Sequence, residues 1–60
     1  MTYEEFKKKL VFKKDKIYIE CLSFSIDKTQ FLTETSYDID AQNKYIEELY
    51  YDNLEQLSKQ

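Results

Sequence analysis

One tyrosine, Tyr51, lies among acidic residues in the stretch 44–57, which reads KYIEELYYDNLEQL. In a helix, its neighbours one turn before and one turn after are Glu47 and Glu55. Carboxylates attract the lysines and arginines of another molecule, and an exposed ring supplies an apolar anchor. These residue types predict a protein-binding face on a partner with a basic surface. We expect that face to comprise Glu47, Glu48, Tyr51, Asp52 and Glu55. The competing interpretation is a solvated helix surface, because amphipathic helices commonly expose acids to water.

Six lysines in the first part of the chain form a second candidate site. They are Lys7, Lys8, Lys9, Lys13, Lys14 and Lys16. Phe12 and Tyr18 lie close to them in sequence, and lysine with exposed aromatic rings is the combination that holds single-stranded nucleic acid. Against this stand the absence of arginine, the net charge of −3 and the acids among the lysines. Nucleic-acid binding is therefore the alternative, with a solvated basic surface as the simplest interpretation.

The charges divide along the chain. Residues 1–32 carry seven lysines and five acids, a net +2, whereas residues 33–60 carry two lysines and seven acids, a net −5. All nine basic residues are lysines, and Lys, Ile and Tyr are frequent. That bias is typical of AT-rich genomes, such as those of low-GC Gram-positive bacteria, their phages and mobile elements. Small acidic proteins of phages and mobile elements often inhibit or escort a larger enzyme, and this chain resembles them in size and charge.

The residues that catalysis and metal binding need are scarce. The chain has no His, no Gly and a single Cys, Cys21, so we expect no enzymatic activity, no cofactor, no zinc site and no internal disulfide. Cys21 lies in an apolar stretch and is predicted to be a packed structural thiol. Asp38 and Asp40 have oxygen ligands at a suitable spacing for a hard cation, but the Gly and distal Glu of a calcium loop are missing. We expect them to cap a helix and predict no metal site.

No apolar run approaches the roughly 20 residues that span a bilayer. Residues 1–16 contain basic residues but no apolar segment of the kind that a signal peptide requires. The sequence therefore predicts a cytoplasmic protein without membrane contact.

The elements that must position these residues begin with a short helix. Thr2 and Glu5 form a capping box, and Tyr3, Phe6 and Leu10 recur at helical spacing. Residues 9–12 can extend that helix or begin a strand, and their β-branched and aromatic content favours the strand.

Two further strands are predicted. Residues 17–26 have apolar side chains on both faces, which indicates one central strand. A turn over 27–29 follows, with Asp27 able to bond the backbone ahead of it. Residues 31–37 alternate as a half-exposed edge strand does, with only Glu34 to block pairing. Pairing along this edge would make a homodimer.

The last predicted helix is capped by Asp38 or Asp40 and runs to about Ser58. Its apolar stripe consists of Ile39, Ile46, Leu49, Tyr50, Leu54 and Leu57. Together these elements predict one small α+β domain over residues 1–60. It would have a short N-terminal helix, a two- or three-stranded antiparallel meander and a long C-terminal amphipathic helix packed on the sheet. The function expected is that of a small binding protein, an inhibitor or accessory subunit of a larger cytoplasmic protein that can be a nucleic-acid-processing enzyme.

Overall fold

The computed structural model describes residues 1–59 and confirms an α+β fold with a short N-terminal helix, three antiparallel strands and a long helix after them. The elements in chain order are α1 (Tyr3–Lys8), β1 (Leu10–Phe12), β2 (Lys16–Ile19), the 3₁₀ turn η1 (Glu20–Leu22), β3 (Phe24–Asp27), α2 (Lys28–Glu34), α3 (Ile39–Asp52) and α4 (Leu54–Leu57). The Thr2–Glu5 capping box is present at the start of α1, and residues 10–12 form the strand that their composition favours.

The prediction of one continuous strand over 17–26 is wrong, because the chain reverses at η1 and forms the β2–β3 hairpin. Ser23 closes the reversal in the left-handed region, with φ of 56°. Ile17 pairs with Ile26 and Ile19 with Phe24, so all four lie on one face of the sheet. A continuous strand would have placed Phe24 and Ile26 opposite Ile17 and left apolar groups on an uncovered face.

The predicted edge strand over 31–37 is also wrong, because most of this segment is the helix α2. Asp27 caps it by accepting a 2.9 Å hydrogen bond from the Gln30 backbone N–H. Phe31 and Thr35 are one helical turn apart and are both buried, and the Thr35 hydroxyl donates to the Phe31 carbonyl at 2.9 Å. The helical spacing of the buried residues outweighs the β propensity of the threonines. The homodimer expected from pairing along 31–37 loses its basis.

The long C-terminal helix ends earlier than predicted, because it breaks at Asn53 into α3 and α4. The Asn53 side chain donates to the Leu49 carbonyl at 2.8 Å. Of the predicted stripe, Ile46, Tyr50 and Leu57 are buried. Ile39 and Leu54 are exposed and do not belong to the core, which corrects the prediction. The predicted cap is confirmed for Asp38, which accepts a hydrogen bond from the Ala41 N–H at 2.9 Å.

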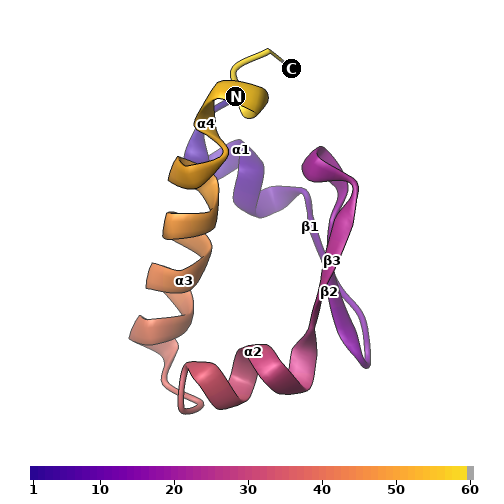
Figure 1. Cartoon of the computed structure of the whole chain (residues 1–60), viewed down its shortest axis with the longest axis vertical. Coiled ribbons are helices and arrows are strands. Elements are labelled where there is room, and N and C mark those ends of the chain that lie inside the picture. The colour runs from indigo at the N-terminus through magenta and orange to yellow at the C-terminus, as the bar shows by residue number, and fades with distance from the viewer. Residues whose placement is uncertain (60) are drawn as a thin grey trace.

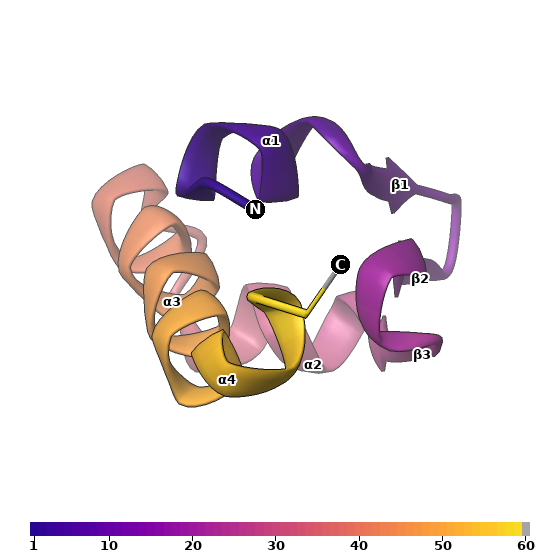
Figure 2. The ribbon, with the colours of Figure 1, turned by 90° about the horizontal axis from the view of Figure 1, so that it is seen from above.

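The helices and the sheet surround the core on different sides (Figure 1). The buried apolar residues are Phe6, Ile17, Ile19, Phe31, Ile46, Tyr50 and Leu57, which together come from every helix and from the central strand β2. Seen from above, α4 turns away from the axis of α3 towards the β2–β3 side (Figure 2). We call the end with α1 and α4 the terminal end. We call the opposite end, formed by the β1–β2 turn, α2 and the α2–α3 loop, the α2 end.

Candidate protein-binding face

Tyr51 is 56% exposed, as its place among the acids predicted. Its ring packs edge-on against the ring of Tyr50, with centroids 5.1 Å apart and an interplanar angle of 77°. Tyr50 is itself buried, and its hydroxyl donates to the Met1 carbonyl at 2.7 Å. The exposed ring therefore rests on a side chain that is fixed by the core, which reduces the rotamer entropy that Tyr51 would lose on binding.

Helix α1 supports this arrangement from one flank. The ring of Tyr3 lies 5.4 Å from that of Tyr50, and its hydroxyl reaches the Asn43 carbonyl at 3.4 Å. Burial raises the pKa of Tyr3, Lys7 opposes that rise and Glu47 adds to it. Glu47 therefore lies on the flank of α3 that faces α1. Tyr51 is one helical turn further along α3 and lies on the same flank.

The four predicted acids are all exposed. They are Glu47, Glu48, Asp52 and Glu55. Within residues 1–59 the single ion pair closer than 4 Å joins Lys7 to Glu4 at 3.3 Å, so the carboxylates of the candidate face have no cationic partner there. Carboxylates that face water without a partner remain available to lysines and arginines of another molecule.

The structure does not gather the five predicted residues into one cluster. Glu48 and Asp52 lie on the flank away from α1, where they line a shallow hollow of about 200 Å³ with Tyr45 and Leu49. Burial raises the pKa of Tyr45, and the charge of Glu34 adds to that rise. The face is therefore a strip that wraps around α3, with Tyr51 on one flank and the hollow on the other.

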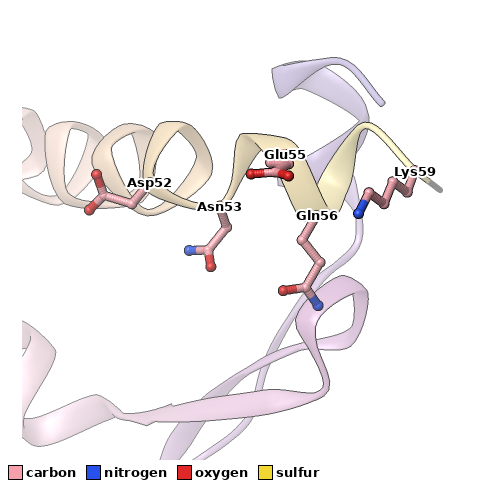
Figure 3. Close-up of a pocket in the computed structure, with 5 residues that line it drawn as sticks. All are labelled: Asp52, Asn53, Glu55, Gln56 and Lys59. Carbon is pink, nitrogen blue, oxygen red and sulfur yellow. The ribbon is translucent and has the colours of Figure 1, made fainter.

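The bend at Asn53 creates a second hollow that the sequence prediction missed. It has a volume of about 350 Å³ and is lined by Asp52, Asn53, Glu55, Gln56 and Lys59 (Figure 3). Asn53 and Gln56 extend to the same side of the bend. The bend places Asp52 and Glu55 in the lining of one concavity, together with Lys59. The signal in the sequence is Asn53 itself, since asparagine bonds nearby backbone groups and disfavours a helix interior.

The lysines of the alternative site fall into two groups separated by β1. Lys7 is engaged at α1, where it pairs with Glu4 and lies 4.7 Å from the centroid of the Tyr3 ring. At the β1–β2 turn, Lys13 lies 5.7 Å from the centroid of the Tyr18 ring. Of the remaining predicted residues, Lys8, Lys9 and Lys14 are exposed and Lys16 is half-buried. Only the second group brings a lysine and an aromatic ring together on the sheet.

Groups suited to metal, thiol or membrane chemistry are few in residues 1–59. No three or more His, Cys, Asp or Glu side chains in that range are placed to hold a metal ion. The sulfur of Cys21, which is half-buried, lies 3.6 Å from the sulfur of Met1. None of the helices in that part of the chain is long and apolar enough to cross a membrane.

Comparisons with protein-family models, with curated proteins and with solved structures gave no match to this chain. Its function therefore has to be inferred from its own residues.

Proposed function

We propose that the chain is a non-enzymatic binding module that docks on a basic surface of a larger protein through the acidic face of α3 and α4. The observation that carries the proposal is Tyr51, which is more than half exposed yet held edge-on against the buried Tyr50. A tyrosine in such a position is a typical interface anchor, because it offers a large contact area at a small entropic cost.

The charges complement this anchor. Glu47, Glu48, Asp52 and Glu55 face water without ion pairs in the described part of the chain, so they attract a basic partner over a distance and speed the encounter. The hollow at Asn53 adds a concavity with Asp52 and Glu55 in its lining, beside Lys59.

The partner we propose is a cytoplasmic enzyme that acts on nucleic acid, because such enzymes have basic grooves that an acidic helix can occupy. The chain would then act as an inhibitor or accessory subunit, in an AT-rich bacterium or one of its phages or mobile elements.

Capture from a nuclease-treated lysate of a low-GC Gram-positive bacterium tests the proposal. The baits are wild type, Tyr51→Ala, and the double variant Glu48→Lys with Glu55→Lys. We expect one protein to be retained by wild type and lost by both variants, and its affinity for the purified chain to fall at least about tenfold with Tyr51→Ala.

Two matched controls make the same types of substitution at exposed positions outside the acidic face. Tyr37→Ala removes another exposed tyrosine, at the α2 end, and Glu20→Lys reverses an exposed acid in η1. Both should leave capture intact. Equal retention by wild type and the Tyr51 and glutamate variants would show that the acidic face is solvated surface and would overturn the proposal.

Binding of single-stranded nucleic acid is the second candidate, and the position of Lys13 beside the Tyr18 ring favours it. It predicts affinity for an oligonucleotide that falls steeply with salt, and a flatter salt dependence in the Lys13→Gln, Lys16→Gln variant. The same oligonucleotide titration with Tyr51→Ala distinguishes the two functions, because only the acidic-face function depends on Tyr51.

A further inference from the structure

The most exposed large apolar side chains of residues 1–59 lie at the α2 end, away from the acidic face. Tyr37 is 69% exposed, Ile39 67% and Phe12 62%, each more than Tyr51. Phe12 is the last residue of β1. Tyr37 lies in the loop before α3, and Ile39 is the first residue of α3. Figure 1 shows both places at the end of the molecule that α2 closes.

The backbone holds Tyr37 outward in an unusual conformation. Helix α2 ends in a Schellman motif, with the Ser36 N–H bonded to the Thr33 carbonyl at 3.1 Å and the Tyr37 N–H to the Leu32 carbonyl at 2.9 Å. Ser36 and Tyr37 both have positive φ, 52° and 57°, although neither is glycine. Non-glycine residues in this region are strained and are frequent at functional sites.

Opposite charges accompany the two apolar groups. At the β1–β2 turn, the exposed Lys13 and Lys14 and the nearby Lys28 outnumber Asp15. Around the α2–α3 loop lie Glu34, Asp38 and Asp40, all exposed. The two groups are net +2 and −3 respectively.

Helix α2 fixes the spacing between these groups. Its first residue is tied to the β1–β2 turn, because the Lys28 N–H donates to the Asp15 carbonyl at 3.1 Å and its Nζ to the Lys13 carbonyl at 3.2 Å. Its last residue, Glu34, leads into the α2–α3 loop. Seven helical residues span about 10 Å, so the basic and acidic groups stand at the two ends of a short rigid rod.

We propose that the α2 end is a self-association surface, on which two copies of this chain pair around a two-fold axis perpendicular to α2. That axis brings the basic group and Phe12 of one copy against the acidic group, Tyr37 and Ile39 of the other, and does so twice. Charge and apolar contact then favour the same arrangement, and every exposed apolar residue of this end is covered. The surface is separate from the acidic face, so the dimer can form whether or not that face binds a partner.

The size of the chain supports a second copy as the occupant. Its accessible surface is 4351 Å², and a standard interface of about 800 Å² per partner would take roughly a fifth of it. A chain of this length buries too little surface on its own for a wide stability margin, and association is a common supplement.

Sedimentation equilibrium of the purified chain up to about 1 mM, at low and high salt, is the first test. We expect a monomer–dimer equilibrium whose dissociation constant rises at least about tenfold between 0.01 and 1 M salt, since the Debye length shortens from about 30 to about 3 Å. Tyr37→Ser should weaken the dimer about tenfold or more without changing the circular dichroism of the monomer. A chain that stays monomeric throughout overturns the proposal, as does a dimer indifferent to both changes.

A charge-swap experiment tests the two-fold arrangement. One variant carries Lys13→Glu and Lys14→Glu, and the other carries Glu34→Lys and Asp40→Lys. Each has like charges at both groups and should be monomeric alone, whereas their equimolar mixture should form a mixed dimer with two attractive contacts. Matched controls with the same change in net charge, Lys8→Glu with Lys9→Glu and Glu48→Lys with Glu55→Lys, should still dimerise. Failure of the mixture to associate, with both variants folded, overturns the arrangement.

Discussion

At the terminal end, Tyr50 is buried against Tyr3 and Phe6 and its hydroxyl is bonded to the chain, whereas at the α2 end Tyr37 is 69% exposed and makes no ring contact within the described residues. Both residues are tyrosines in or next to the same long helix. The first closes the core of a chain too short to bury much else. Tyr37 is held outward by the backbone geometry. Its ring is therefore available for contact with another molecule and contributes little to the stability of the fold.

Truncation of each side chain tests whether Tyr50 and Tyr37 differ in this way. Tyr50→Ala should lower the free energy of unfolding by about 3–5 kcal/mol, because it removes a large buried side chain and leaves a cavity. Tyr37→Ala should change it by less than about 0.5 kcal/mol, as is usual for surface substitutions. Urea unfolding at low protein concentration measures both without a contribution from association.

If Tyr50→Ala does not fold, Tyr50→Phe keeps the ring and removes only the hydrogen bond to Met1, at a cost of about 1 kcal/mol. Similar losses for Tyr50→Phe and Tyr37→Phe would contradict the distinction between the two ends.

A smaller effect tests whether the α2 end depends on its backbone caps. Asp38→Ala should lower the free energy of unfolding by about 1 kcal/mol, because the Ala41 N–H at the start of α3 loses its acceptor. Asp40→Ala, in the same turn but without the capping bond, is the control in thermal unfolding. Equal losses of unfolding free energy for the two substitutions would contradict the capping role of Asp38.

The smallest effect is a pH dependence at the terminal end. Hydrogen bonds from the Thr2 backbone N–H and hydroxyl hold the pKa of the Glu5 carboxyl below its ordinary value. A depressed pKa in the folded chain contributes stability above the unfolded pKa, and that stability is lost as pH falls through the folded pKa. The difference in unfolding free energy between wild type and Glu5→Gln should therefore be present at neutral pH and vanish in acid. Glu48→Gln, which alters an acid with no hydrogen bond in residues 1–59, should show no such pattern.

The parts of the fold that could be predicted are those in which the interacting residues are close together in the sequence. The capping box at Thr2 and Glu5 and the cap at Asp38 are interactions between residues three positions apart, and both are present. The strand prediction for residues 31–37 was wrong because so short a segment fits both strand alternation and helical spacing. The burial of Phe31 and Thr35, four positions apart, matches the helix. For the candidate face, the exposure of Tyr51 was predictable from its place among the acids, outside the apolar stripe. The hollow at Asn53 was not, because it arises from a bend.

Residues close together in the chain were enough to predict the α+β class of the fold, the capped starts of α1 and α3 and the division of charge between the two halves. Tertiary packing alone decides that the apolar stretch 17–26 reverses at η1, that Asn53 turns α4 over the core, and that Phe12, Tyr37 and Ile39 all lie at the α2 end, on either side of α2. The physical reason is that a sheet covered on one face gathers its apolar side chains on that face. The way the elements close around the core then determines which exposed residues become neighbours. Such residues are far apart in the sequence, so no local pattern predicts them.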